Sequence, residues 1–415
     1  MKPRMVAAVD IGSSKVCSLL ANVEGDSIQV VGMGICPSRG IQKGMVTEID
    51  QAAEAIKESV RRAEQTSGER IGSVYLGITG STISSQGNKG MISTGRNPRL
   101  VSQKDVNRAL ATARQYEIPE DRRLLHVIPT QYSLDGQAGV KDPKGMKGFR
   151  LDVDTHIVTI TEGAAENIIK SARKAGLNIE GLVLQCLASA QAVLQPEETD
   201  AGVVLVEIGA GTTGLSTYKN GSIELTAVLP VGGNQITRDL AIGLGIPFEV
   251  AERIKKEHCD LSGKDEADDS EGQQTVTINF DGVGKIFKKD LNDIVRARVE
   301  EMVKMAISQL PDPHARISEF PAGLVLVGGT ANLAGIEYVA HAATGLPVRV
   351  GMPDGMSGLA DTLYNPAYAS SVGLLLCSGK WHREQNWIKE GFKGKLAGGV
   401  KSIKQHVPRI KIVTG

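Results

Sequence analysis

The hydrophobic and polar positions of the chain follow two different periods. Short apolar runs bounded by turn residues predict buried strands, and apolar residues spaced near 3.6 predict amphipathic helices. The strand candidates are residues 71–78, 178–184 and 323–328, and the helix candidates are residues 48–66, 163–175, 234–245 and 288–309. Strands that alternate with helices in this way indicate an α/β fold.

One hairpin-rich unit occurs twice. Residues 6–30 read VAAVDIGSSKVCSLLANVEGDSIQV, and residues 203–225 read VVLVEIGAGTTGLSTYKNGSIEL. Each unit has an apolar run, an acid, Ile-Gly, a turn of small or hydroxyl residues and further strands. We therefore expect two similar lobes that face each other.

Two stretches interrupt this pattern and are expected to be insertions. In the first, residues 84–161, Ser102 and Asp105 open a helix as in a capping box, and strand-like runs follow. The second, residues 246–308, contains an acidic stretch at 260–272 that we interpret as a solvated loop. The expected division is 1–83, 162–196 and 364–380 for the first lobe, 197–245 and 309–363 for the second, and 381–415 for a tail.

Charge is distributed unevenly over the 415 residues, although the net charge is zero. From Lys380 to Gly415 there are nine Lys and Arg and two Glu, a net of +7, so the remainder carries −7. A basic tail on an acidic body predicts an anionic partner for the tail. Aromatic residues make up 4% of the chain, which argues against a nucleic-acid partner bound by base stacking.

The cysteines and the N-terminus predict a cytosolic protein. Five cysteines lie far apart without metal-ligand spacing, as expected for reduced thiols. Asp10 interrupts the first apolar run, so the N-terminus does not read as a signal peptide, and no run reaches the roughly 18 apolar residues of a membrane span.

The first candidate for chemistry is the turn Asp10-Ile-Gly12-Ser13-Ser14-Lys15. A strand followed by such a turn exposes backbone N–H groups to an anion such as a phosphate. The two hydroxyls can donate further hydrogen bonds, Lys15 can neutralise a phosphate oxygen, and Asp10 can hold a hydrated Mg²⁺ ion. Taken alone, the pattern also fits an ordinary hairpin turn.

The second candidate, Glu207-Ile-Gly209-Ala-Gly211-Thr212-Thr213, has the same architecture and could clamp phosphates from the opposite side. A third, Gly328-Gly329-Thr330-Ala-Asn332, follows a buried strand and is expected to run into a helix, and its glycines allow a base or ribose to approach the backbone. Its alternative is a helix-capping turn.

The fourth candidate lies on a predicted helix, where Glu252 and either Lys255 or Lys256 share one face. These side chains could bond a ribose and a base, or they could belong to a solvated helix face.

The order of these segments resembles the actin/Hsp70/sugar-kinase superfamily, and within it the cell-division FtsA family. The resemblance covers about residues 5–380, and its most specific block is residues 124–159, which is similar to the small subdomain that FtsA carries in place of an actin subdomain. The segments that carry it are AAVDIGSSKV, LLHVIPTQYSLDGQAGVKDPKGMKGFRLDVDTHIVT, LASAQAVL, VLPVGGNQITRDLAIGLGIP, AERIKK and LVLVGGTANLAGI.

The resemblance implies an actin-like (ribonuclease H-like) duplicated two-lobed α/β fold with an FtsA-type inserted subdomain. It implies ATP and Mg²⁺ between the lobes, polymerisation into filaments, and tethering of FtsZ filaments to the cytoplasmic face of the cell membrane at the division site, with recruitment of other division proteins. Arg298 and Glu301 would face the C-terminal peptide of FtsZ, or else form an exposed charged helix face. Asp10 and Glu207 would hold the metal, and the implied nucleotide-binding residues are Asp10, Gly12, Ser13, Ser14, Lys15, Gly209, Gly211, Thr212, Thr213, Gly232, Gly233, Glu252, Lys255, Gly328, Gly329, Thr330 and Asn332.

The chain departs from the family's usual pattern at two places. The second loop usually reads Asp-Ile-Gly-Gly-Gly-Thr-Thr-Asp, but here Glu207, Ala210 and Gly214 replace three of its residues. The connecting segment usually has Glu-Pro where this chain has Gln185-Cys186. With Asp10, Gln185 and Glu207 as the catalytic candidates, we expect ATP binding with slow hydrolysis, because phosphoryl transfer depends on positioning.

The tail predicts a basic amphipathic helix that lies in the lipid interface. Its glycines and Pro408 make a helix marginal in water, so a disordered basic linker and a helix packed on the body remain alternatives. The apolar residues that share one helical face are Ile388, Phe392, Leu396, Val400, Ile403 and Val407.

Two rival functions share the fold. A sugar-kinase-like phosphotransferase would need a second substrate pocket with a base, which the sequence does not reveal. An actin-like adaptor of pilus or secretion assembly would bind a different partner. A chaperone is excluded because only about 35 residues follow the last predicted helix.

Overall fold

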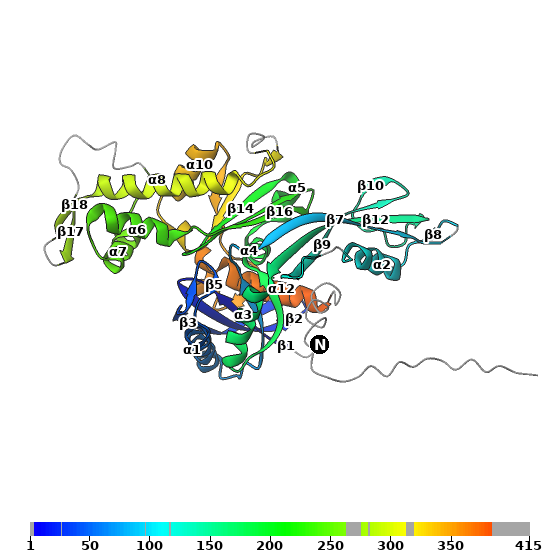
Figure 1. Ribbon diagram of the computed structural model, residues 1–415, viewed down its shortest axis with the longest axis horizontal. Helices are drawn as coiled ribbons and strands as arrows, with labels where there is room; N and C mark the ends of the chain where they lie inside the picture. The colour runs from blue at the N-terminus through cyan, green and yellow to red at the C-terminus, as the bar shows by residue number, and fades with distance from the viewer. Residues whose placement is uncertain are drawn as a thin grey trace, which may run out of the picture.

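The repeated hairpin unit forms the centre of each of two lobes. In a computed structural model, which describes residues 4–25, 27–95, 97–115, 118–262, 275–280, 283–312 and 319–383, the two lobes lie one above the other (Figure 1). The first lobe has a six-stranded sheet in the order β13-β6-β1-β2-β3-β21, and the second has a five-stranded sheet in the order β16-β15-β14-β19-β20. The predicted α/β two-lobed fold is confirmed.

The two sheets share one local plan. In each, an antiparallel pair (β1–β2 or β14–β15) has a parallel strand beside its first member. The first sheet comprises β1 (Arg4–Ile11), β2 (Lys15–Glu24), β3 (Ser27–Pro37), β6 (Ser73–Ile78), β13 (Asn178–Leu184) and β21 (Ser357–Gly358). The second comprises β14 (Val203–Ile208), β15 (Thr213–Lys219), β16 (Ser222–Leu229), β19 (Leu324–Val327) and β20 (Val348–Val350).

Amphipathic helices cover the sheets, as their apolar spacing predicts. In the first lobe α1 lies very close to β3, because a Cβ atom at Gly34 would stand 1.9 Å from the carbonyl oxygen of Ser59. The helices of this lobe are α1 (Ile49–Ser67), α3 (Glu162–Lys174), α4 (Gln185–Val193) and α12 (Ala369–Arg383). Those of the second lobe are α6 (Gly233–Leu244), α7 (Phe248–His258), α8 (Lys288–Ile307) and α10 (Ile336–Thr344).

Shorter elements connect these layers. The second lobe carries a hairpin of β17 (Thr275–Phe280) and β18 (Val283–Phe287), which lies at its outer end beside α7 (Figure 1). The remaining short elements are β4 (Ile41–Gln42), β5 (Met45–Val46), α5 (Pro196–Ala201), α11 (Ala360–Leu363), and the 3₁₀ turns η2 (Gly329–Asn332) and η3 (Pro366–Tyr368).

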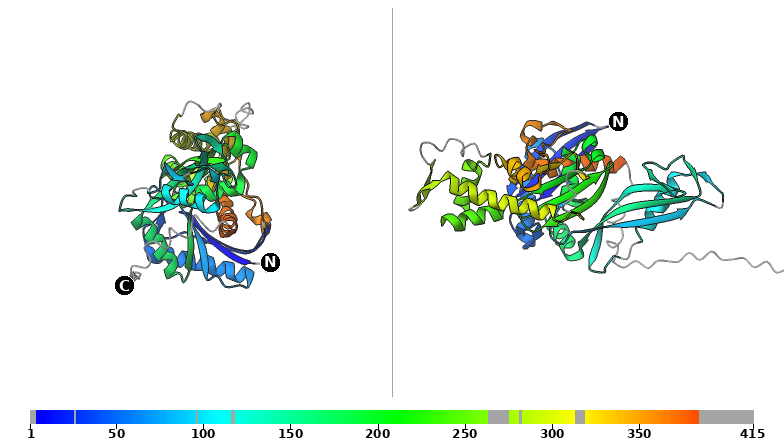
Figure 2. Two further views of the ribbon diagram at one scale, coloured as in Figure 1. Left: turned by 90° about the vertical axis from the view of Figure 1, so that its right-hand side faces the viewer. Right: turned by 90° about the horizontal axis from the view of Figure 1, so that it is seen from above.

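A separate sheet projects from the first lobe, at the opposite end of the molecule from β17 and β18 (Figures 1 and 2). Its strands lie in the order β10-β9-β12-β7, and α2 packs on it with its own apolar core. Asp105 replaces the usual Glu or Gln of the capping box at Ser102, and both reciprocal hydrogen bonds are present. The elements are β7 (Ser84–Ser93), β8 (Arg99–Leu100), α2 (Gln103–Ala113), β9 (Arg122–Leu134), β10 (Gln137–Val140), β11 (Lys147–Gly148) and β12 (Arg150–Thr161).

The structure differs from the sequence predictions in two details. β21 pairs with β3 of the first lobe, although the expected division placed residues 309–363 in the second lobe. The segment after Gly328 is a single 3₁₀ turn, and the helix that follows begins only at Ile336. The tail residues predicted to contact a membrane, and most of the acidic loop 260–272, lie outside the described residues.

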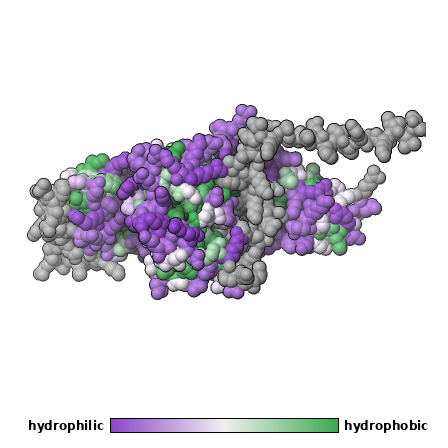
Figure 3. Space-filling view, turned by 90° about the horizontal axis from the view of Figure 1, so that it is seen from below, coloured by the Kyte–Doolittle hydropathy of each residue, from purple (hydrophilic) through white to green (hydrophobic). Residues whose placement is uncertain are grey.

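The face of the molecule seen in Figure 3 is mostly hydrophilic where it is coloured, with apolar patches among the polar residues. Four exposed apolar side chains, Met91, Leu100, Met146 and Phe149, belong to the projecting sheet and its loops. Ile242 and Phe248 are exposed on α6 and α7, toward the other end of the molecule. Within the described ranges, no helix has both the length and the apolar character needed to cross a membrane.

Candidate functional site

The two predicted phosphate loops are built alike. In the first, the N–H of Gly12 donates to the carbonyl of Lys15 at 3.0 Å, and in the second the N–H of Gly209 donates to the carbonyl of Thr212 at 2.9 Å. Each bond closes a turn whose tip is two residues, Ser13–Ser14 in one case and Ala210–Gly211 in the other.

The backbone donors at these tips are available to an anion. In the part of the chain that the structure describes, the N–H groups of Ser13, Ser14, Ala210 and Gly211 have no hydrogen-bond partner. The tips also meet across the lobes, because a Cβ atom at Gly211 would stand 2.6 Å from Ser13 Oγ. A glycine is therefore required at this approach.

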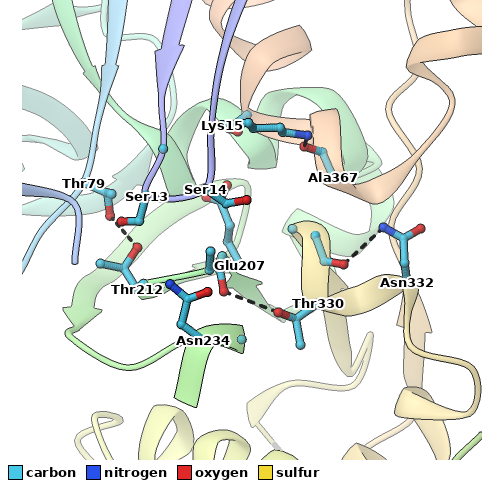
Figure 4. Close-up of a pocket in the computed structure, with 18 of the residues that line it drawn as sticks. Ser13, Ser14, Lys15, Thr79, Glu207, Thr212, Asn234, Thr330, Asn332 and Ala367 are labelled. Atoms are coloured by element: carbon cyan, nitrogen blue, oxygen red, sulfur yellow. Dashed lines mark hydrogen bonds between the residues drawn. The ribbon is translucent and has the colours of Figure 1, made fainter. Parts of the chain in front are cut away.

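A pocket of about 380 Å³ lies between the loops and brings most of the predicted residues together (Figure 4). Of these, Asp10, Gly12, Ser13, Ser14, Lys15, Gln185, Glu207, Gly209, Gly211, Thr212, Gly233, Glu252, Lys255, Gly328, Gly329, Thr330 and Asn332 line it. The sequence did not point to five further lining residues, Thr79, Asn234, Leu333, Ala367 and Ser370. It placed Ala210 in the second loop without a binding role, and it named Lys256 only as an alternative to Lys255.

Thr213 and Gly232, both predicted to bind nucleotide, do not line the pocket but support the second loop. The hydroxyl of Thr213 donates to the carbonyl of Val231 at 2.9 Å. A Cβ atom at Gly232 would stand 2.7 Å from the carbonyl oxygens of Gly209 and Ala210, so only glycine fits there.

Asp10 is buried and has three side-chain donors around its carboxylate. Gln185 Nε2 donates to Oδ1 at 2.5 Å, and the hydroxyls of Ser370 and Ser371 donate to Oδ2 at 2.6 and 2.7 Å. These serines come from the start of α12, whose N-terminal end also favours a negative charge. The side chain of Gln185 is thus committed to positioning Asp10 through its amide nitrogen, and only its oxygen is left to orient a water.

Glu207 occupies the matching position on the second loop and is also buried. Burial, together with the nearby charge of Asp10, raises the pKa of Glu207 to about 8. Two buried carboxyl groups at one edge of a phosphate pocket favour a bound cation, since a divalent ion would compensate the repulsion that keeps one of them protonated.

Lys15 lines the pocket, and its ammonium group binds Ala367, another lining residue, in the turn before α12 (Figure 4). Its Nζ donates to the carbonyl of Ala367 at 2.8 Å and lies 3.8 Å from the centroid of the Tyr368 ring. Burial lowers the pKa of Lys15, and the charge of Asp10 opposes this shift. Ala367 occupies only one of the three donors of the Lys15 ammonium group, and binding of a phosphate by Lys15 stays a prediction of the sequence.

A buried lysine, Lys255, holds the opposite side of the pocket. Lys255 Nζ donates to the carbonyl of Gly233 at 3.1 Å, to the hydroxyl of Thr237 at 2.7 Å and to Glu252 at 2.6 Å. Its three donors are therefore all in use, and they fix α7 against the start of α6. Burial alone would raise the pKa of Glu252, but the charge and hydrogen bonds of its lysine neighbours outweigh it and lower the pKa.

The turn at Gly328 lines the same side of the pocket as Lys255. Gly328 has φ +89°, and a Cβ atom there would stand 2.5 Å from the carbonyl oxygen of Ile208, so the close approach requires glycine. The side-chain amide of Asn332 donates to Asn365 Oδ1 at 3.0 Å, which ties the turn to the segment before α12.

Arg298 and Glu301 lie away from the pocket, on α8. Arg298 forms a two-point ion pair with Asp239 of α6, with NH2 3.2 Å from Oδ1, and also contacts Glu301. Arg298 is largely covered, whereas 54% of the Glu301 side chain is exposed. The pair, together with Asp239, forms one charged cluster on the outer face of the second lobe.

The fold and the pocket between two matched loops define an actin-like two-lobed protein. Solved structures with this fold include the PilM–PilN type IV pilus biogenesis complex, with a TM-score of 0.63 and 17% identity over 90% of this chain and 98% of that one. MreB5 of Spiroplasma citri, in a structure bound to ADP, gives a TM-score of 0.54 and 12% identity over 92% of this chain and 98% of that one.

Sequence comparison specifies the family. The profile described as cell division protein FtsA matches residues 204–373, and that of the SHS2 domain inserted in FtsA matches residues 80–159. The chain is 38% identical over 382 residues to cell division protein FtsA of Neisseria meningitidis serogroup B, covering 90% of this chain and 89% of the relative. For the protein of the same name from Escherichia coli K12, the identity is 32% over 383 residues and 90% of each chain. The chain belongs to the FtsA family of cell-division proteins.

Proposed function

We propose that the chain binds ATP with Mg²⁺ in the pocket between its lobes and acts as an actin-like adaptor in cell division. The observation that carries this proposal is the pair of matched hairpin turns that meet at Ser13 and Gly211, each with backbone donors free for phosphate. The space beside Gly328, which is lined by glycines, suits the adenosine, and the half-buried Glu252 suits its ribose hydroxyls.

The residues also fit a magnesium ion. A bound Mg²⁺ would supply positive charge to the phosphates and to the two buried carboxyl groups, Asp10 and Glu207. Among the described residues, no group of three or more His, Cys, Asp or Glu side chains is placed to hold a metal ion. In proteins Mg²⁺ usually keeps several water ligands and binds through one or two carboxylates and the substrate phosphates. Because Asp10 already accepts three hydrogen bonds, we expect it to act on the ion largely through water.

Slow hydrolysis is part of this proposal. Gln185 cannot act as a base, and its amide nitrogen is committed to Asp10. Glu207 has a carboxyl group with a raised pKa and one methylene more than the aspartate of the usual pattern. The pocket therefore favours nucleotide binding over turnover, as expected of a protein whose nucleotide controls assembly.

Self-association into filaments is supported by apolar surface at both ends of the molecule. Leu100 and Phe149 are exposed at the end of the projecting sheet, and Ile242 and Phe248 are exposed on the second lobe. A contact between two different patches of identical chains repeats without closing and generates a filament. We expect substitution of Leu100 by Glu to reduce sedimentation of the assembled protein.

We further propose that the filaments bind FtsZ through its C-terminal peptide and attach it to anionic lipids of the cytoplasmic membrane face at the division site, where other division proteins are recruited. The charged cluster of Asp239, Arg298 and Glu301 is the candidate peptide site, and the basic tail that contains Ile388 and Phe392 is the candidate membrane anchor.

The test of the partner is binding of a labelled FtsZ C-terminal peptide, measured by fluorescence anisotropy. Substitution Arg298→Ala should weaken binding, whereas Arg61→Ala, which removes an arginine from a similar i,i+3 ion pair on α1, should not. Equal affinities for the two variants would contradict the assignment. A pilus-type adaptor shares the fold, but both family profiles and the identity to FtsA proteins favour cell division.

A further inference from the structure

A short hairpin that no sequence motif marks lies against the phosphate end of the pocket. β4 and β5 pair through Ile41–Val46 and Gln42–Met45, and the turn between them consists of Lys43 and Gly44. Both turn residues have positive φ, +49° and +73°, as in the tight type I′ turn of a two-residue hairpin. Ile41 is buried in the core of the first lobe and anchors the hairpin.

The tip of this hairpin touches both phosphate loops. The N–H of Gly44 donates to Ser13 Oγ at 2.9 Å, which connects it to the loop of the first lobe. A Cβ atom at Gly211 would stand 3.0 Å from the Cα of Lys43, which places the tip beside the loop of the second lobe. The hairpin tip thus lies where the two lobes meet.

Gly44 is held tightly in this place. A Cβ atom there would stand 2.7 Å from Cγ2 of Thr79 and 2.9 Å from the carbonyl carbon of the same residue. Thr79 lines the pocket, and its hydroxyl lies 3.5 Å from that of Thr212. The amide of Gly44 therefore has little freedom to move away from Ser13.

The hydrogen bond from Gly44 makes the Ser13 hydroxyl an acceptor on one side and leaves its proton to be donated on another. A serine hydroxyl has one proton to donate, and since the N–H of Gly44 occupies an acceptor site of Ser13, its proton remains for another acceptor. Ser13 lines the pocket on the side opposite Thr330 and Asn332, which border the expected adenosine site (Figure 4). An acceptor at that end would be the terminal phosphate of a nucleoside triphosphate.

We propose that Gly44 is a positioning residue, which orients the Ser13 hydroxyl to donate to the terminal phosphate and so gives the site its preference for ATP over ADP. This inference rests on the proposed ATP site. It adds the β4–β5 hairpin to that site as an element that distinguishes triphosphate from diphosphate, in contact with the loops of both lobes.

The experiment titrates the nucleotide-free full chain with Mg-ATP and Mg-ADP by isothermal titration calorimetry. The variants are Ser13→Ala, Gly44→Ala and the double variant. Gly68→Ala is the matched control, since Gly68 has φ +74° but nothing within 4 Å of a Cβ atom. Each single substitution at 13 or 44 should weaken ATP binding by about tenfold, the value of one hydrogen bond to a charged group, and ADP binding by less than about twofold.

The combination tests whether Gly44 acts through Ser13. If it does, the double variant loses no more ATP affinity than Ser13→Ala alone, because the two residues serve one hydrogen bond. Additive losses, equal losses for ATP and ADP, or a Gly44→Ala affinity equal to that of Gly68→Ala would overturn the inference.

A measurement on the unmodified protein covers the case in which Gly44→Ala does not fold. Amide hydrogen exchange at residues 41–46 should be slower with ATP than with ADP, and equal exchange would contradict the proposal. If the unmodified protein binds no ATP, the proposed function fails together with this inference. If it binds ATP but neither variant nor exchange separates ATP from ADP, only this inference fails.

Discussion

Gly214 on β15 lies directly against Cys186 on α4. A Cβ atom at 214 would stand 3.1 Å from the Cβ of Cys186 and 3.9 Å from that of Glu207. Both positions depart from the usual family pattern, which has an acid at the first and a proline at the second. A side chain at position 214 would therefore press against Cys186 beside the second carboxylate.

We expect Gly214→Ala to lower the free energy of unfolding by about 1–3 kcal/mol, the usual cost of overpacking a filled site. Gly72→Ala, where a Cβ atom would meet nothing within 4 Å, should change it little. In Cys186→Gly, the same substitution at 214 should cost less, because the opposing Cβ is gone. Chemical denaturation of the four combinations measures the coupling, and strictly additive effects would contradict the direct contact.

The sequence predicted the parts of the site that are local in the chain. The turns at Ser13–Ser14 and Ala210–Gly211 were recognisable because in each case a strand ends near an acid and a turn of small residues follows it in the sequence. Ala210 could replace the usual glycine because, unlike Lys43, it is not among the described residues with positive φ.

The parts that the sequence did not reveal are brought in from distant segments. Ser370 and Ala367 come from the last helix and the turn before it, and no local motif marks them. When α12 packs against β1, the hydroxyl of Ser370 can donate to Asp10, and the carbonyl of Ala367 can accept from Lys15. The hydrogen bond from Gly44 to Ser13 joins residues 31 positions apart, and no local motif in the sequence predicts it.

Glu207→Asp should increase the rate of ATP hydrolysis. The shorter side chain removes one methylene from the expected magnesium shell and restores the carboxylate position of the usual pattern, and a misplacement of about 1 Å can cost roughly 100-fold in rate. Single-turnover hydrolysis measures the step directly, and ATP affinity measured on the same preparations separates chemistry from binding. An unchanged rate would show that the position of this carboxyl group does not limit hydrolysis.

Two buried histidines should make the protein less stable in mild acid. His126 Nε2 accepts the N–H of Leu184 at 3.1 Å, and His156 Nε2 lies 3.0 Å from the hydroxyl of Thr226, so they join the projecting sheet to both lobes. Burial lowers the pKa of His126 to about 3, with a further contribution from the nearby His156, and burial lowers that of His156 to about 4.

The direction of the pH dependence follows from these values. An unfolded histidine titrates near pH 6.5, so between about pH 6.5 and pH 4 the unfolded chain binds protons that the folded chain does not. The stabilising contribution is complete above pH 6.5 and is lost as the pH falls, by at most about 1.4 kcal/mol per pH unit for each histidine. His156→Gln should reduce the slope of unfolding free energy against pH in denaturant titrations. The same slope in both proteins would be inconsistent with this role.

The basic tail should be required for lipid binding. The full chain should sediment with liposomes that contain anionic lipid, because each basic residue near such a surface contributes about 1 kcal/mol. A chain that ends at Arg383, the last residue of α12, should stay in the supernatant. Salt should weaken the binding of the full chain by screening. Equal sedimentation of the two chains would remove the membrane anchor from the proposal.

The central claim is that two matched turns, one after Asp10 and one after Glu207, hold a shared triphosphate between the lobes. Calorimetric titration of folded, nucleotide-free protein with ATP and Mg²⁺ tests it most directly. The account predicts a heat of binding with one nucleotide per chain, weakened when magnesium is removed with EDTA. The absence of any binding heat at several temperatures would contradict it.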